Sequence, residues 1–95
     1  MTEDSARSDS ETHQVAEATA LLAARGIPAT AREFRLRQEF FRYRWDIRVR
    51  EEESGWTVHA VKPDRPEILI QASTEGNVLR LALMTALQAD ETAPA

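Results

Sequence analysis

Apolar residues recur at helical spacing near the start of the chain. The spacing i, i+3, i+7 places three of them on one side of a helix: Val15, Ala18 and Leu22. This stripe predicts an amphipathic helix over about residues 12–25. Gly26 and Pro28 predict its end, because glycine adopts the left-handed conformation found after helices and proline cannot continue one.

A second helix is predicted over about residues 75–88, where apolar residues surround most of the circumference. Leu81 and Met84 lie opposite the main apolar stripe, beside Arg80. A helix that is apolar on nearly all sides is usually buried on more than one side. Either the first helix covers Leu81 and Met84, or these residues and Arg80 form a contact with a partner protein or a second copy of the chain.

Strict alternation predicts β-strands between the two helices. Residues 42–50 alternate charged side chains with four apolar ones: Tyr43, Trp45, Ile47 and Val49. This period of two is typical of a strand that is buried on one face. Two further strands are expected at residues 56–61 and 68–72, separated by the loop of residues 62–66, which contains two prolines.

Residues 31–41 allow two interpretations. As a strand, the segment would place three apolar side chains on one face: Phe34, Leu36 and Phe40. As a helix, it would have a capping box formed by Thr30 and Glu33. On a helical wheel, however, Phe34 and Phe41 lie about 120° from the other two apolar residues, so the four form no single stripe. We therefore favour a fourth strand here, with the helix as the alternative.

These elements predict an α+β fold, with a small antiparallel sheet of three or four strands and an N-terminal and a C-terminal helix packed on one face. A chain of 95 residues is enough for one domain, and 42% apolar with 29% charged residues is a globular composition. We expect the domain to span residues 12–89. The polar segment of residues 1–11 and the tail of residues 90–95 are expected to be disordered.

The order helix, three strands, helix is similar to the double-stranded-RNA-binding fold. Members of that family carry a lysine cluster at the start of the second helix, and this resemblance would imply phosphate binding there. The corresponding residues 73–77 include no basic side chain, so the family's phosphate-binding residues are not carried over. Separately, residues 21–35 (LLAARGIPATAREFR) look like the turn of a helix-turn-helix motif, although the third helix of that motif is missing.

Groups that could support catalysis or bind a metal are scarce. The absence of cysteine excludes disulfides, thiolate zinc sites and cysteine nucleophiles. His13 and His59 are too far apart for a histidine-rich metal motif, and none of the three glycines belongs to a phosphate-binding loop. An enzyme that used His59 as a base would need a pocket that the sequence does not reveal. We therefore expect no catalytic residue, no cofactor and no metal.

Positive charge is concentrated in one part of the chain. The net charge is −4, yet seven of the twelve basic residues lie within residues 32–50. If the predicted strands are correct, six arginines and one histidine project from one face of the sheet: Arg35, Arg37, Arg42, Arg44, Arg48, Arg50 and His59. Such a face either binds the phosphates of a nucleic acid or is a solvated surface paired with Asp46, Glu39 and Glu67.

The leading hypothesis is a small non-enzymatic binding or regulatory protein that acts through protein–protein contacts at Leu81, Met84 and Arg80, with a partner protein or with a second copy in a homodimer. The alternative is a nucleic-acid-binding protein that uses the arginine-rich face. The N-terminus has no apolar signal region, and no apolar run reaches the length of a membrane span. We therefore expect a cytoplasmic protein without a membrane partner.

Overall fold

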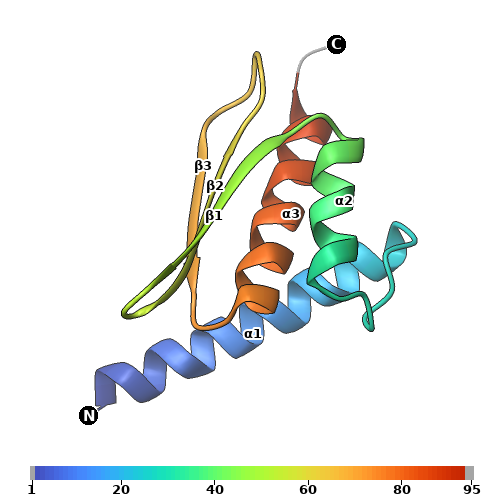
Figure 1. Cartoon of the computed structure of the whole chain (residues 1–95). Helices are drawn as coiled ribbons and strands as arrows, with labels where there is room; N and C mark the ends of the chain where they lie inside the picture. The colour runs from blue at the N-terminus through green and yellow to red at the C-terminus, as the bar shows by residue number, and fades with distance from the viewer. Residues whose placement is uncertain (1, 94–95) are drawn as a thin grey trace.

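The fold contains three helices and one three-stranded sheet. Their order along the chain is α1 (Thr2–Ala24), α2 (Glu33–Arg42), β1 (Asp46–Glu52), β2 (Gly55–Val61), β3 (Ile68–Ala72) and α3 (Glu75–Thr92). The computed structural model describes the backbone of residues 2–93 and the side chains of residues 10–93. The helices lie on one side of the sheet (Figure 1). The predicted α+β class is confirmed. The sheet has three strands, and there are three helices where two were expected.

The sheet is an antiparallel meander in which β2 lies between β1 and β3. One row of residues across the three strands faces the helices: Val49, Val58 and Ile70. Because side chains alternate along a strand, the next row faces away from the helices. That row contains Arg48, His59 and Leu69. The alternation predicted for these three strands is therefore confirmed.

Residues 33–42 form the helix α2, and the strand favoured for this segment was wrong. Leu36 and Phe40 lie one turn apart on the inner face of α2 and are buried, whereas Phe34 and Phe41 are exposed to solvent. The four apolar residues point to two sides of the helix, as the helical wheel indicated, and only one of these sides packs in the core. Burial of this narrow stripe stabilises the helix.

The end of α2 explains why β1 begins later than predicted. Arg44 adopts a left-handed conformation, with φ of 66°. Its N–H donates to the carbonyl of Phe41 at 3.0 Å, and the N–H of Trp45 donates to the carbonyl of Phe40 at 2.9 Å. These two bonds form a Schellman cap, which is more often built around glycine. Arg42 and Arg44 therefore lie on a helix and its cap, and not on a strand as predicted.

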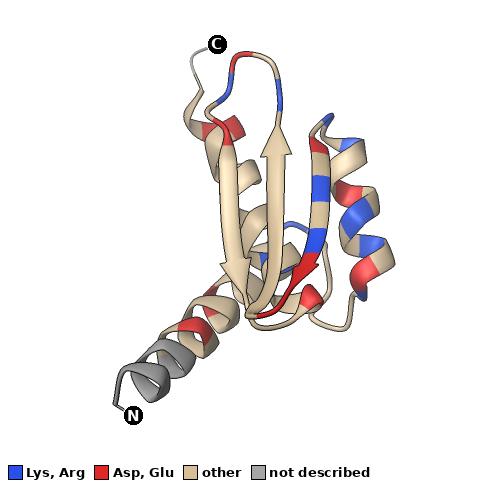
Figure 2. Cartoon of the chain, turned by 60° about the vertical axis from the view of Figure 1, so that its left-hand side comes forward, with Lys and Arg blue, Asp and Glu red and all other residues tan. Residues whose placement is uncertain are grey.

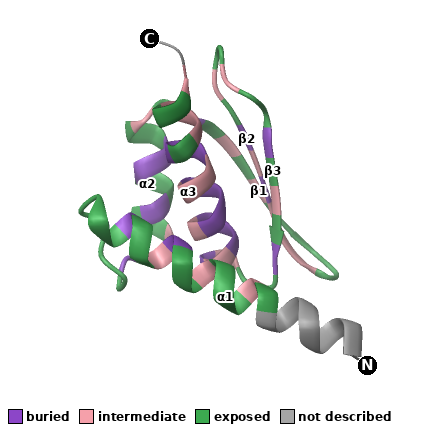
Figure 3. Cartoon of the chain, turned by 180° about the vertical axis from the view of Figure 1, so that it is seen from behind, coloured by how far each residue is buried: buried purple, intermediate pink, exposed green. Residues whose placement is uncertain are grey.

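The helix α3 is the central element of the core, because it contacts α1, α2, β2 and β3. Its buried apolar residues surround most of the helix: Val78, Leu79, Leu81, Ala82, Leu83, Ala86 and Leu87. Figure 3 shows this buried helix enclosed by the other elements. The side chain of Thr74 caps its start by accepting a 3.1 Å hydrogen bond from the N–H of Asn77.

Both terminal helices are longer than predicted: α1 starts ten residues earlier and α3 ends four residues later. Of the two segments expected to be disordered, the side chains of residues 1–9 and all of residues 94–95 lie outside what the structure describes. Glu11 and Asp90 lie inside it, and both form hydrogen bonds with other elements. We therefore place these two residues within the folded domain.

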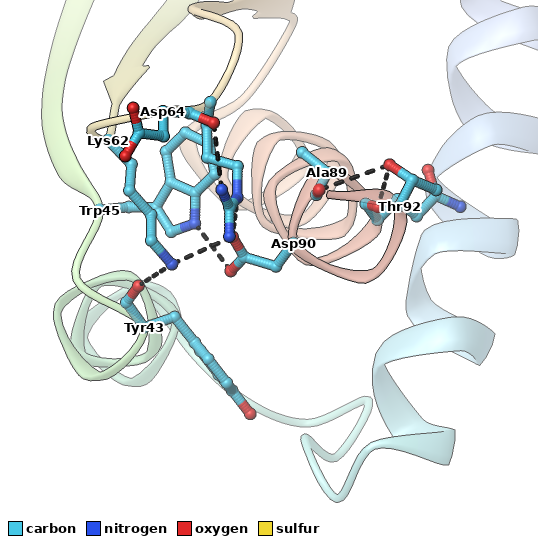
Figure 4. Close-up of polar contacts among 9 residues, drawn as sticks. Tyr43, Trp45, Lys62, Asp64, Ala89, Asp90 and Thr92 are labelled. Atoms are coloured by element: carbon cyan, nitrogen blue, oxygen red, sulfur yellow. Dashed lines mark hydrogen bonds and ion pairs between the residues drawn. The ribbon is translucent and has the colours of Figure 1, made fainter. Parts of the chain in front are cut away.

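Asp90 joins the last turn of α3 to the rest of the molecule (Figure 4). Its Oδ1 accepts hydrogen bonds from Lys62 Nζ at 3.0 Å and Arg65 Nε at 2.9 Å, and its Oδ2 accepts one from Trp45 Nε1 at 3.2 Å. Burial alone would raise the pKa of Asp90, but the hydrogen bonds outweigh burial and lower it. The carboxylate thus fixes the start of β1 and the β2–β3 loop against α3.

Candidate functional site

β3 is a free edge of the sheet, because it pairs with β2 on one side and with no strand of the described chain on the other. Its five residues, ILIQA, carry no charge. Proteins usually protect such edges from pairing with other chains by charged side chains, proline or bulges. The opposite edge, β1, has that protection, because five of its seven residues, DIRVREE, are charged. α2 also lies beside β1 (Figure 2).

A groove of about 410 Å³ lies beside this free edge, between β3, α1 and α3. β3 contributes Leu69, Ile70 and Gln71 to its lining, and α3 contributes Leu81 and Met84. Leu69 is 70% exposed. The groove, called the β3 groove below, therefore combines apolar side chains with the unpaired backbone groups of an edge strand.

Polar residues line the far side of the β3 groove. α1 contributes Gln14 and Glu17, and α3 contributes Thr85 and Gln88. Glu17 is the single charged residue among the described residues that line the groove. A carboxylate beside an otherwise uncharged groove favours a ligand that carries a positive charge next to its apolar part.

The position of α1 along this groove is fixed by Glu11. Its carboxylate accepts hydrogen bonds from the N–H of Ser73 at 3.0 Å and from the side-chain amide of Asn77 at 2.8 Å. The Ser73 hydroxyl donates to the same carboxylate. Burial would raise the pKa of Glu11, but these hydrogen bonds outweigh it and lower the pKa. α1 is thereby held at the start of α3, close to the end of β3.

The three residues of the predicted protein contact lie in different environments. Leu81 is only 6% exposed, and Met84 is half-buried. Both line the β3 groove. Arg80 lies elsewhere: its guanidinium donates hydrogen bonds to the carbonyl oxygens of Ala29 and Ala31, at 3.3 Å and 2.8 Å, and so holds the α1–α2 loop. Leu81 and Met84 thus remain candidate contact residues only as part of this groove.

The predicted arginine face of the sheet is divided by the fold. Arg35, Arg37 and Arg42 belong to α2, and Arg44 belongs to its cap. Only three members of the predicted set lie on the outer face of the sheet: Arg48, Arg50 and His59. The prediction of one arginine-rich sheet face was therefore wrong, because residues 33–42 form a helix.

Carboxylates neutralise part of the positive charge. Arg35 pairs with Glu39 at 3.1 Å, and Arg37 pairs with Glu75. On the sheet, His59 Nε2 lies 2.6 Å from Glu67 Oε1. Of the three acids considered as partners of this face, only Glu67 pairs on the sheet, because Glu39 pairs with Arg35 within α2. The third, Asp46, forms no ion pair with a described side chain, and the same is true of Arg48 and Arg50.

Sequence reasoning missed two surface features of the fold. The first is the free edge of β3, because the order of strands in a sheet is not visible in a sequence. The second is the exposure of Phe34 and Phe41 on α2. The available signal was the angle of about 120° between these phenyl groups and the core stripe, which is compatible with a helix that exposes one aromatic face.

Comparison with known proteins found no matching protein family, no similar curated protein and no similar solved structure. Within the described residues, no helix is long and apolar enough to cross a membrane. The described side chains also include no group of three or more histidine, aspartate or glutamate residues that could hold a metal ion.

Proposed function

We propose that this protein is a small non-enzymatic binding protein that holds an extended segment of a partner protein against the free edge of β3. The observation that carries this proposal is the uncharged, unpaired β3 edge beside an apolar groove. In this mode of binding, an extended peptide adds a strand to a sheet. Main-chain hydrogen bonds provide affinity, and alternate side chains of the peptide provide specificity.

The lining of the β3 groove indicates which segment would bind. Every second side chain of an added strand would point toward the helices, as Ile70 does. Apolar side chains at those positions would contact Ile70 and Met84. A lysine or arginine among them would meet Glu17. We therefore expect a segment of alternating apolar and polar residues with one basic residue.

The position of α1 favours a single extended segment over a second copy of this chain. α1 crosses α3 on the side of the molecule where β3 forms the edge of the sheet (Figure 3). Glu11 holds it there through Ser73 and Asn77. A second copy that paired its own β3 with this edge would also have to fit its own α1 and α3 along the same edge. A bare strand has no helix to accommodate, so it fits beside β3 more readily.

The proposal can be tested with a short fluorescein-labelled peptide that alternates valine and threonine around one central lysine. Binding is measured by fluorescence anisotropy. Two further peptides carry N-methyl groups on alternate amides, one on each edge of the extended peptide. Only one edge can pair with β3, so one methylated peptide should lose binding while the other retains it.

Variants of the protein give an independent comparison. Leu69→Lys with Gln71→Lys places charges on the edge strand and should weaken binding about tenfold or more. Val61→Lys is the matched control, because Val61 is a half-exposed apolar residue of the central strand β2. Absence of binding, or equal binding of both methylated peptides, would overturn the proposal. If sedimentation shows instead that the protein is a dimer and that Leu69→Lys dissociates it, the β3 edge binds a second copy of the chain and not a peptide.

A further inference from the structure

A second apolar surface lies on α2, which flanks β1 at the opposite edge of the sheet from β3 (Figure 2). Phe34 and Phe41 are 73% and 84% exposed. They are seven positions apart in the sequence, which is close to two helical turns. Both therefore point to the same side of α2, about 10.5 Å apart along its axis. Leu36 and Phe40 hold the other side of α2 in the core. Core packing therefore does not explain the two exposed residues, called the phenyl face below.

The surroundings of the phenyl face are basic in an acidic protein. Residues 32–44 contain five arginines and two glutamates, a net charge of +3, whereas the rest of the chain carries −7. Local charge of this kind steers a partner of opposite charge toward the surface on which it lies. The sign of the local charge therefore indicates the chemistry of the partner.

Three of these arginines are available to a partner. Arg32 and Arg44 are exposed and form no ion pair with a described side chain. Arg42 is 71% exposed, and its one ion pair, with Glu39, is long at 3.8 Å. The buried carboxylate of Glu39 has a shorter ion pair with Arg35, at 3.1 Å, so Arg42 can turn to a partner's carboxylate without leaving Glu39 unpaired. Positive charge is thus available at both ends of α2.

We infer that the phenyl face of α2 binds an acidic amphipathic helix of a partner protein. Apolar residues of a helix recur at i, i+3, i+4 and i+7, and such a stripe can cover Phe34 and Phe41, which are themselves seven residues apart. Aspartate or glutamate residues on either side of that stripe would pair with the three available arginines. Burial of two large aromatic side chains supplies the affinity, and the charges set the orientation of the partner.

Two other occupants fit this surface less well. A second copy that used the same surface would place the basic segment of residues 32–44 against itself, which opposes association. A nucleic acid carries a charge at every phosphate, including those beside Glu75, which pairs with Arg37, whereas a helix can carry its carboxylates only where they face the available arginines. This inference is independent of the β3 groove, and the two sites would let one molecule hold two partners at once.

A labelled helical peptide with a leucine stripe and flanking glutamates tests the inference, and the same peptide with lysines in place of the glutamates is its control. The glutamate peptide should bind, and Phe34→Ser with Phe41→Ser should weaken it about tenfold or more. The variant Val61→Ser, which alters an exposed apolar residue on β2 without adding a charge, should bind it unchanged. Amide shifts in NMR spectra of the complex should be confined to α2 and its neighbours.

Charge reversal gives the sharpest readout. The double variant Arg32→Glu with Arg42→Glu should no longer bind the glutamate peptide and should bind the lysine peptide instead, because the charge beside the phenyl face is reversed. The inference is overturned if the glutamate peptide does not bind at low salt, or if serine at both phenylalanine positions leaves its affinity unchanged. It is also overturned if labelled single-stranded DNA binds this face in preference to the peptide.

Discussion

The indole Nε1 of Trp45 donates a 3.2 Å hydrogen bond to Oδ2 of Asp90, so the residue that completes the cap of α2 is tied to the last turn of α3. The other oxygen of the same carboxylate accepts hydrogen bonds from Lys62 and Arg65. One side chain therefore joins the start of β1, the β2–β3 loop and the end of α3 (Figure 4). Each of these segments should move if Asp90 is changed.

We expect Asp90→Asn to lower the free energy of unfolding at neutral pH by about 1–3 kcal/mol, because three donors lose their charged acceptor. Urea denaturation followed by tryptophan fluorescence measures this change. Asp46→Asn is the control, because Asp46 is exposed and forms no ion pair with a described side chain. Equal stability of the two variants would contradict the assigned role of Asp90.

The contribution of Asp90 should also depend on pH. Burial raises its pKa, the hydrogen bonds from Lys62, Trp45 and Arg65 lower it, and the net result is a pKa below the ordinary value of 3.8. The folded state therefore holds the proton less tightly than the unfolded state. The stabilisation is complete above pH 3.8 and is lost as the pH falls through the lower, folded-state pKa. The difference in stability between wild type and Asp90→Asn should shrink over that range, and a constant difference would refute the prediction.

Two glycines with positive φ should respond differently to alanine. A Cβ on Gly55 would lie 2.4 Å from the carbonyl oxygen of Ala72, whereas a Cβ on Gly26 would meet no atom within 4 Å. We expect Gly26→Ala to cost about 1–2 kcal/mol, from the left-handed backbone alone. Gly55→Ala should cost more than about 3 kcal/mol, because the clash is with backbone that cannot move aside easily. Urea denaturation of both variants checks the order, and similar losses would show that the turn before β2 can adapt.

Substitutions of the buried and of the exposed phenylalanines of α2 should have different effects on stability. Phe40→Ala should lower the free energy of unfolding by about 3–5 kcal/mol, because Phe40 is fully buried. Phe34→Ser with Phe41→Ser should change it by less than about 0.5 kcal/mol per residue, because both side chains are exposed. Thermal and urea denaturation give both values. A large loss in the double variant would mean that the phenyl face serves stability and not binding.

Labelled DNA and RNA, titrated across a salt series, test the arginines of the sheet. Arg48 and Arg50 share the outer face with Glu52 and Glu67. We therefore expect binding to be weak and its salt dependence shallow, with a slope that corresponds to about two phosphates at most. If binding depends steeply on salt, and if the double variant Arg48→Glu with Arg50→Glu abolishes it, this face binds nucleic acid.

Local patterns were sufficient to predict most of the fold. The alternation around Ile47, Val49 and Val58 specifies strands, and the stripe of Val15, Ala18 and Leu22 specifies a helix, because each pattern is complete within its own segment. Residues 31–41 lack such a pattern. Whether Phe34 or Phe40 enters the core depends on what α3 presents to this segment, and that is a tertiary relationship.

The candidate site was less accessible to sequence reasoning than the fold. The angular positions of Leu81 and Met84 set them apart from the main stripe of α3, and both residues line the β3 groove. What surrounds that side depends on how α1 crosses α3 and on which strand ends the sheet. Glu11, at the edge of the segment expected to be disordered, makes one of the contacts that decide this crossing.

The central position of α3 has a consequence for folding during synthesis. α1 packs mainly on α3, and α2 and two strands of the sheet also depend on it, yet α3 is translated after all of them. Until residues 75–92 have emerged from the ribosome, the earlier elements have no shared partner and their apolar faces stay uncovered. We therefore expect nascent chains stalled before Glu75 to be degraded rapidly by proteases and bound by chaperones, and native protection to appear in one late step.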